Sequence, residues 1–161
     1  MKISILCSDP KHPINPYLVK WKNKYVDENS IEIVSEKNKL SGGDILFLIS
    51  CYEIIREDIR RHYKKTLVIH ASDLPEGRGW SPHVWKILEG SDELTISLLD
   101  ADDNVDSGDI YNKKRIGIRR DEVAVEINEK IFKAEIELMS FALENFDELI
   151  SIGQDEAKAS Y

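Results

Sequence analysis

One histidine in the sequence stands where a catalytic group is expected. The stretch Thr66–His70 has the apolar character of a short strand, and His70 is its last residue. In α/β proteins ligands bind outside the carboxyl ends of parallel strands, so this histidine is a candidate for proton transfer or for stabilising negative charge. Pro75, Gly77 and Gly79 give the following chain an unusual path. A histidine satisfied by hydrogen bonds in the core is the alternative interpretation.

Five aspartates lie between residues 100 and 109. They fit a solvated acidic loop, a metal site, or a single aspartate that enters a reaction site while the others stay in water. The spacing departs from the EF-hand pattern and lacks its closing glutamate, so we predict no metal site. Asp106 is the best candidate for a reactive carboxylate, because Gly108 permits a tight turn just before the next strand.

Alternating strands and helices must position these residues. Apolar runs and turn signals predict strands at 2–7, 30–34, 44–50, 66–70, 93–99 and 110–118, and helices at 15–25, 56–63, 81–88 and 121–150. This order predicts the α/β class, with a Rossmann-like, mostly parallel sheet flanked by helices and a long C-terminal helix. The expected apolar positions of that helix are Val125, Ile131, Ile136, Met139, Leu143 and Phe146. The segments 8–13, 50–55 and 70–80 should meet in one crevice, joined by the loop 100–108.

Length and charge narrow the classes of protein. A chain of 161 residues suits one domain, which we expect over residues 1–150, followed by a polar C-terminal tail at 151–161. The net charge of −8 argues against a nucleic-acid partner. No apolar run has the roughly 20 residues that cross a membrane, and the start of the chain does not resemble a signal peptide. Cys7 and Cys51 are not spaced as metal ligands, and we expect a cytoplasmic protein with reduced thiols.

The candidate residues form an ordered set between about Gly43 and Lys114. The set consists of His70-x-Ser72-x-Leu74-Pro75, Arg78-Gly79, Pro82, Trp85, Ile87, Gly90 and Asp106-x-Gly108-Asp109-Ile110. It resembles the folate-dependent formyltransferase family, which includes glycinamide ribonucleotide formyltransferase, the catalytic domain of methionyl-tRNA formyltransferase and the amino-sugar formyltransferases. The segment HASDLPEGRGWSPHVWKILEG is most similar to the corresponding segment of the sugar-nucleotide N-formyltransferases of pseudaminic acid pathways. The resemblance implies the formyltransferase fold, with residues 1–150 as its catalytic domain.

The resemblance also implies a donor and a mechanism. The donor would be 10-formyltetrahydrofolate, used without a metal, and its pterin would bind to the backbone of two loops. His70 would stabilise the charge on the formyl oxygen, and Asp106 would orient His70 and help to take the amine proton. The implied donor-binding residues are Tyr52, Glu53, Ile54 and Ile55 in one loop and Ala101, Asp102 and Asp103 in the other. Core packing is a second interpretation of the two isoleucines.

The sugar branch implies a small acceptor, a nucleotide-linked amino sugar. Candidate contacts to this substrate are Lys11, His12, Ser72, Arg78 and Trp80. We expect no tRNA-gripping domain after Ile150, in line with the acidic charge. The long C-terminal helix could pair with the same helix of a second copy of the chain, so a homodimer is an open alternative.

One position departs from the family. The family pattern is Asn-x-His, whereas this chain has Val68-Ile69-His70. Valine cannot donate a hydrogen bond, so Asn104, Ser72 or an ordered water would have to take over as donor to the formyl oxygen. Two other functions stay open: a formyltetrahydrofolate hydrolase with water as acceptor, and a non-catalytic module that binds folate or a nucleotide sugar. A dinucleotide-binding protein is disfavoured, because no G-x-G-x-x-G follows the first strand.

Overall fold

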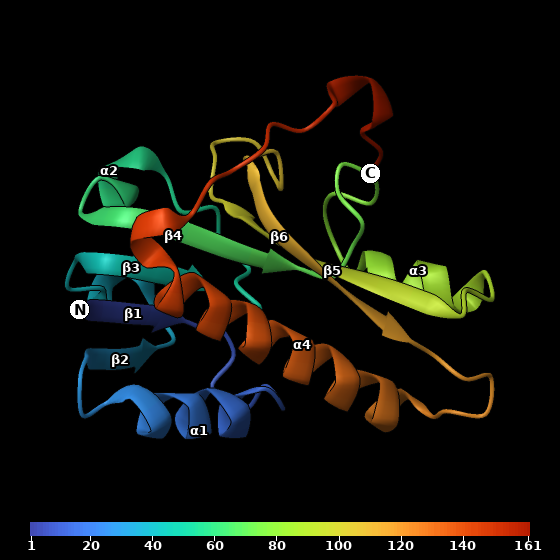
Figure 1. The fold of residues 1–161 in the computed structure, drawn as a ribbon, viewed down its shortest axis with the longest axis horizontal. Helices are drawn as coiled ribbons and strands as arrows, with labels where there is room; N and C mark the ends of the chain where they lie inside the picture. Colours follow the sequence, from blue (N-terminus) through green and yellow to red (C-terminus); the bar gives the residue numbers. More distant parts are fainter. The chain divides into compact units, whose positions relative to one another are not determined.

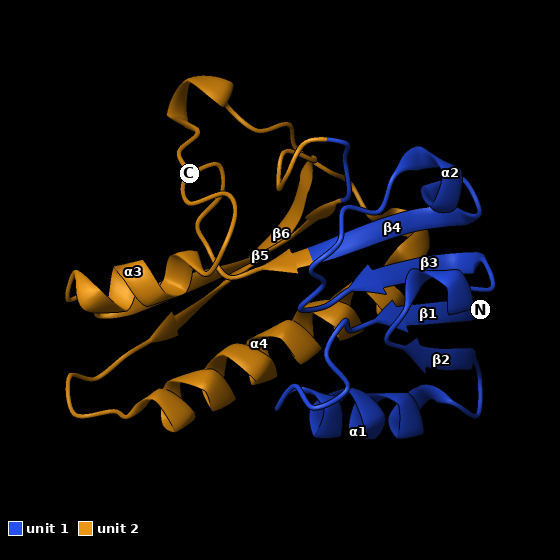
Figure 2. Cartoon of the chain, turned by 180° about the vertical axis from the view of Figure 1, so that it is seen from behind, with its two compact units in different colours: residues 1–68, 101–103 blue, residues 69–100, 104–161 orange.

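The computed structural model describes residues 1–161, which form two compact units (Figure 2). Unit 1 consists of residues 1–68 and 101–103, and unit 2 of residues 69–100 and 104–161. The strands are β1 (Lys2–Leu6), β2 (Ser30–Val34), β3 (Gly43–Leu48), β4 (Tyr63–His70), β5 (Glu93–Asp100) and β6 (Ile110–Gly117). The helices are α1 (Asn15–Tyr25), α2 (Glu57–Arg60), α3 (Pro82–Leu88) and α4 (Ala124–Glu144), with the short 3-10 helices η1 (Lys37–Lys39), η2 (Phe146–Glu148) and η3 (Glu156–Lys158).

Unit 1 holds parallel strands in the order β2-β1-β3-β4 (Figure 1). The two inner strands β1 and β3 are buried on both faces, as is typical of a parallel sheet. Ile5 and Leu6 of β1 and Ile45 and Leu46 of β3, which point alternately to the two faces, have no exposed surface. The helix α1 packs beside β2, and its Trp21 ring meets the Phe47 ring edge-on at 5.8 Å between centroids. The apolar run predicted as a strand at 44–50 is therefore central to this unit.

In unit 2 the strands β5 and β6 pair antiparallel, and α4 packs against both (Figure 1). The buried residues of α4 recur at helical spacing along one face. They include Ile127, Ile131, Ala134, Leu138, Met139 and Ala142. The parallel strands of unit 1, this antiparallel pair and the long helix confirm the predicted α/β class. None of the helices is both long and apolar enough to span a membrane.

Two predicted helices are longer than the structure allows. The helix expected at 121–150 begins at Ala124 and ends at Glu144, because Asn145 leaves the helical conformation with φ −115° and ψ 21°. Val125 is 68% exposed, and Phe146 lies beyond the helix, so their assignment to its apolar face is wrong. Helical spacing alone does not say which side of a helix faces the strands.

The second correction concerns α2 and the start of β4. The helix expected at 56–63 covers only Glu57–Arg60, and β4 begins at Tyr63, before the predicted start at Thr66. The Tyr63 ring is buried, and its hydroxyl donates to Oγ of Ser4 at 2.9 Å and accepts from the backbone N–H of Gly42 at 3.1 Å. These contacts hold Tyr63 in the sheet.

Residues 151–161 fold back onto loops of unit 2, and we call them the C-terminal strap. Ile152 and Ile110 exchange two backbone hydrogen bonds, each of 2.9 Å. Further along, the backbone N–H of Arg78 donates to the carbonyl of Ser160 at 2.8 Å, and the Ser160 N–H donates to the carbonyl of Pro75 at 3.2 Å. The strap is the red end of the ribbon in Figure 1, and it finishes beside the loop that follows β4.

Candidate active site

His70 is the last residue of β4 and presents its Nε2 atom to two partners in unit 2. Nε2 lies 2.8 Å from the carbonyl oxygen of Gly77 and 3.5 Å from Oδ2 of Asp106. A carbonyl oxygen only accepts, so Nε2 carries the hydrogen in this arrangement. The His70 side chain is 12% exposed. His70 is therefore a partly shielded N–H donor beside a carboxylate, at the end of a strand.

The backbone around Asp106 fixes its carboxylate. Oδ2 accepts from the N–H of Gly79 at 2.9 Å. Asp106 itself has a φ of +52°, in the left-handed region that aspartate and asparagine adopt more readily than most residues. At Gly108 the chain passes so close to the backbone of Asp100 that any Cβ would overlap the Asp100 carbonyl oxygen. Glycine is thus needed there for the close approach of two chain segments.

Arg78 makes a different contact from the one expected of a substrate-binding residue. Its side chain is 2% exposed, and its Nη1 and Nη2 donate to the two carboxylate oxygens of Glu156 at 3.0 and 2.6 Å. Nη2 and Nε also donate to Oε1 of Gln154 at 2.9 and 3.3 Å. The contact with Glu156 raises the pKa of Arg78 above its ordinary value. In this structure Arg78 binds the C-terminal strap.

Three other residues of unit 2 are predicted to contact the acceptor substrate or to donate a hydrogen bond to the formyl oxygen. Their surroundings differ. Trp80 is 74% exposed, beside the glycine that binds Asp106. Ser72 is buried, its carbonyl accepts from Oγ of Ser97 at 2.7 Å, and its own hydroxyl has no hydrogen-bond partner in the protein. Asn104 is exposed two residues before Asp106, and its carbonyl accepts from Oγ of Ser107 at 3.1 Å.

Lys11 and His12 belong to unit 1. The Lys11 side chain is exposed, and its backbone N–H donates to Oδ1 of Asp9 at 2.8 Å. Nδ1 of His12 accepts from the N–H of Ile14 at 3.2 Å, and its Nε2 lies 3.3 Å from Oγ of Ser50. Burial lowers the pKa of His12, although the charge of Asp9 acts in the opposite direction. The predicted neighbourhood of segments 8–13 and 50–55 is thus present within unit 1.

The two loops predicted to bind the donor also lie in unit 1, where one arginine joins them. Arg60 donates through Nη1 to the carbonyl of Ile55 at 2.8 Å and to Oδ1 of Asp103 at 3.0 Å. The N–H of Ala101 donates to the carbonyl of Thr66 at 2.8 Å, which places the start of the second loop beside the middle of β4. The loops are therefore held together by a charged side chain that the sequence interpretation missed. The only signal was an arginine shortly after the first loop, and nothing in the sequence connected it with residue 103.

The individual residues of the donor loops differ in exposure. Ile55 is buried in an apolar cluster with Leu6 and Leu48, which agrees with core packing at this position. Tyr52 and Ile54 are about half exposed, at 53% and 47%. Glu53 pairs with Lys37 at 2.5 Å. Asp102 turns toward the backbone and accepts from the N–H of Asp103 at 2.7 Å.

Val68 lies among apolar side chains. It packs against the cluster of unit 1 that contains Leu6, Leu46, Leu48, Ile55 and Tyr63. The position that carries asparagine in the family pattern is thus filled by an apolar side chain in apolar surroundings.

A second histidine of unit 2 accompanies His70. His83 lies in the first turn of α3, and its Nδ1 is buried without a hydrogen-bond partner in the protein. Burial lowers the pKa of His83, and the neighbouring His70 lowers it further. The sequence interpretation missed this residue, although it belongs to the same string, HASDLPEGRGWSPH, as His70.

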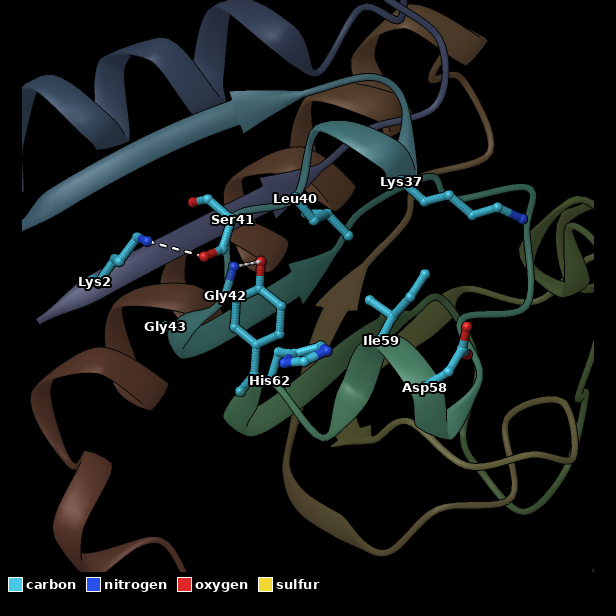
Figure 3. Close-up of a pocket in the computed structure, with 10 residues that line it drawn as sticks. Lys2, Lys37, Leu40, Ser41, Gly42, Gly43, Asp58, Ile59 and His62 are labelled. Carbon is cyan, nitrogen blue, oxygen red and sulfur yellow. Dashed lines mark hydrogen bonds between the residues drawn. The ribbon is translucent and has the colours of Figure 1, made fainter.

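A hollow of about 620 Å³ in unit 1 lies at the other ends of the strands (Figure 3). It is lined by Lys2, Gly43 and Tyr63, which begin β1, β3 and β4. The Lys2 ammonium donates to the carbonyl of Ser41 at 3.0 Å, so it is already engaged. Ligands of α/β sheets bind at the carboxyl ends of the strands, and this hollow is at the amino ends. Residues 1–161 also contain no group of three or more histidine, cysteine or acidic side chains arranged to hold a metal ion.

Known proteins match the chain in sequence. A family model described as formyl transferase matches residues 8–143. The methionyl-tRNA formyltransferase of Sulfurihydrogenibium sp. (strain YO3AOP1) is 30% identical over 137 residues, which cover 83% of this chain and 44% of that protein. The one of Caldicellulosiruptor saccharolyticus is 24% identical over 153 residues, which cover 92% of this chain and 49% of that protein. The chain thus spans about half the length of these curated relatives.

Solved structures share the fold. The methionyl-tRNA formyltransferase from Clostridium thermocellum aligns with a TM-score of 0.82 at 23% identity, over 99% of this chain and 70% of that one. The formyltransferase PseJ from Anoxybacillus kamchatkensis, in complex with UDP-4,6-dideoxy-4-formamido-L-AltNAc and tetrahydrofolate, aligns with a TM-score of 0.79 at 19% identity, over 100% and 85%. The predicted formyltransferase fold is confirmed. Because the family model covers most of its residues, the chain belongs to the formyl transferase family.

Proposed function

We propose that this chain transfers a formyl group from 10-formyltetrahydrofolate to an amine, with His70 and Asp106 at the reacting atoms. The observation that carries the proposal is the shielded pair at the end of β4, in which the Nε2 atom of His70 lies 3.5 Å from Oδ2 of Asp106. Membership of the family supports it.

The pair supplies what the reaction needs. The amine nitrogen attacks the formyl carbon, and the negative charge that develops on the formyl oxygen accepts a hydrogen bond from Nε2–H of His70. Asp106, held by Gly79, favours the hydrogen on Nε2 and accepts the amine proton directly or through water. The bond from the formyl carbon to nitrogen 10 of the folate then breaks, and that nitrogen takes up the proton that Asp106 accepted, directly or through water. The formyl oxygen thereby replaces the carbonyl oxygen of Gly77 as the acceptor of the hydrogen bond from Nε2 of His70.

The donor is proposed to bind through the backbone of the loops 52–55 and 101–103. Arg60 supports this proposal, because it fixes the carbonyl of Ile55 and the carboxylate of Asp103 relative to each other. A pocket lined by backbone needs its two loops to be fixed relative to each other, since its binding groups cannot be repositioned by rotating side chains. The tetrahydrofolate bound to the fold relative PseJ is in line with this donor.

Arg60→Ala should weaken binding of tetrahydrofolate. The variant loses two charge-assisted hydrogen bonds between the donor loops, and we expect a rise of about tenfold in the dissociation constant. Calorimetric titration of the full chain with tetrahydrofolate measures this directly and needs no acceptor. Arg61→Ala is the matched control, because Arg61 is the neighbouring arginine and is exposed. Equal affinities of the R60A variant and the unmodified chain would contradict the assignment of these loops.

The acceptor is proposed to be a nucleotide-linked amino sugar. The motif HASDLPEGRGWSP, the net charge of −8 and the exposed ring of Trp80 support it, because a tRNA substrate needs cationic surface for its phosphates. The test is incubation with 10-formyltetrahydrofolate and each of two acceptor types, amino-sugar nucleotides and methionyl-tRNA, with the products weighed by mass spectrometry. Formylated sugar nucleotide is the expected product. Formylation of methionyl-tRNA alone would overturn the acceptor, and formate release without any acceptor would favour a hydrolase.

A binding module without turnover is the second candidate function. Val68 favours it, since an apolar side chain packed in an apolar cluster stands where the family has a hydrogen-bond donor. Tetrahydrofolate binding with no formyl transfer to any acceptor would distinguish this candidate from the enzyme.

A further inference from the structure

The amide of Gln154 lies where three segments of unit 2 meet. Its Nε2 donates to the carbonyl oxygens of Asp106 and Gly108 at 2.8 and 2.7 Å. Its Oε1 accepts from the guanidinium of Arg78 at 2.9 and 3.3 Å. Both hydrogens and the oxygen of the amide are therefore used, which leaves the side chain a single orientation.

These segments carry the groups that hydrogen-bond to His70 and to Asp106. The carbonyl that accepts from His70 belongs to Gly77, and the N–H that binds the Asp106 carboxylate belongs to Gly79, so Arg78 lies between the two. On the other side, Gln154 holds the carbonyl of Asp106 itself, whose left-handed backbone is a conformation that neighbours must maintain. A shift of either loop would change the distance between Nε2 and Oδ2.

The rest of the C-terminal strap anchors this amide. Glu156 binds the Arg78 guanidinium through both carboxylate oxygens, a bidentate geometry with strong directional preference. Ser160 adds a hydrogen bond from the N–H of Gly77 to its Oγ at 3.0 Å, besides the two backbone bonds to Pro75 and Arg78. The strap is thus bonded to the loop 75–79 through Gln154, Glu156 and Ser160, and to the Asp106 turn through Gln154.

We infer that Gln154 is a positioning residue for the His70–Asp106 pair, held in place by the Arg78–Glu156 ion pair. The amide ties the turn that bears Asp106 to the loop that binds both His70 and the Asp106 carboxylate. The positioning of His70 and Asp106 by Gln154 does not depend on the reaction that the chain catalyses, whereas the effect of Gln154 on turnover rests on the proposed function.

The experiment compares two substitutions that remove different halves of the amide. Gln154→Glu keeps an acceptor for Arg78 but cannot donate to the carbonyls of Asp106 and Gly108, and Gln154→Ala removes both. Lys158→Ala is the control within the strap, since Lys158 pairs only with the exposed Asp155. Exchange of the His70 Nε2 hydrogen with solvent, followed by NMR on histidine-labelled full chain, is the first readout. We expect exchange to be at least about tenfold faster in both Gln154 variants and unchanged in the control.

Steady-state kinetics give the second readout. Displacement of the reacting pair should lower kcat by about 10- to 100-fold in both variants, with the KM for 10-formyltetrahydrofolate within about twofold of the unmodified chain. Unaltered exchange at His70 in folded Q154A and Q154E would overturn the inference. If the unmodified chain shows no formyl transfer, the proposed function fails while the exchange measurement still decides the role of Gln154. Should neither variant fold, Glu156→Gln, which keeps a hydrogen bond to Arg78 but not its charge, takes their place, and unaltered exchange in it would count equally against the inference.

Discussion

Replacement of His70 by asparagine should reduce formyl transfer by about 10³-fold while the fold is preserved. Asparagine fills much of the volume of histidine but removes the Nε2–H group that lies beside Asp106. The rate of product formation in a quenched-flow or mass-spectrometric assay measures the loss. Tetrahydrofolate affinity should stay unchanged, because the donor is proposed to bind through the backbone of the loops 52–55 and 101–103, and tetrahydrofolate lacks the formyl group that His70 is proposed to contact.

His62→Asn is the matched control for this substitution. His62 is exposed and lines the hollow at the amino ends of β1, β3 and β4, and it makes none of the hydrogen bonds that hold His70 and Asp106. Its replacement should leave turnover within about twofold of the unmodified chain, as surface substitutions away from functional contacts do. Near-normal formyl transfer by well-folded H70N protein would end the catalytic role of His70.

The free energy of unfolding should decrease as the pH rises from 5 to 8, because of Glu135. This residue of α4 is 8% exposed, its Oε2 has no hydrogen-bond partner in the protein, and burial raises its pKa to about 8. Between the ordinary pKa of 4.5 and this raised value, the folded chain keeps a proton that the unfolded chain releases. At 1.36 kcal/mol per unit, the interval up to pH 7 corresponds to a loss of roughly 3 kcal/mol.

Glu135→Gln removes the titrating group and should remove this pH dependence. The variant should be more stable than the unmodified chain at pH 8, by roughly 2–4 kcal/mol less the cost of burying the amide. The two proteins should be nearly equally stable at pH 5. Urea unfolding at several pH values measures both slopes, and Glu129→Gln on the exposed side of α4 is the control. Parallel slopes for the E135Q variant and the unmodified chain would show that the carboxyl group is not buried in neutral form.

The elements closest to the candidate site could be predicted from local sequence. The apolar stretch before His70 and the aspartate–glycine turn at 106–108 both have short-range signatures, and the ends of parallel strands are where such groups are useful. Gly77 and Gly79, which the sequence predicts to bend the chain, supply the backbone groups that bind His70 and the Asp106 carboxylate.

The contacts of Arg78 and Arg60 could not be predicted in this way. Arg78 binds Gln154 and Glu156, which are 76 and 78 residues away in a polar segment without periodicity. Arg60 reaches Asp103 across 43 residues. Side-chain pairs of this kind depend on the tertiary path of loops, and a single sequence holds no pattern for them. The exposure of Val125 has the same origin, because the face of α4 that is buried is decided by the strands beneath it.

The left-handed backbone at residue 106 restricts which amino-acid substitutions the chain tolerates at that position. Most L-amino acids are strained at a φ of +52°, so glycine, asparagine and aspartate are the residues that keep the turn without strain. Only one of the three carries a carboxylate. Glutamate, the usual chemical substitute, would have both a longer side chain and a strained backbone. For a chain that needs a negative charge at this position, the shape of the turn therefore leaves aspartate as almost the only suitable amino acid.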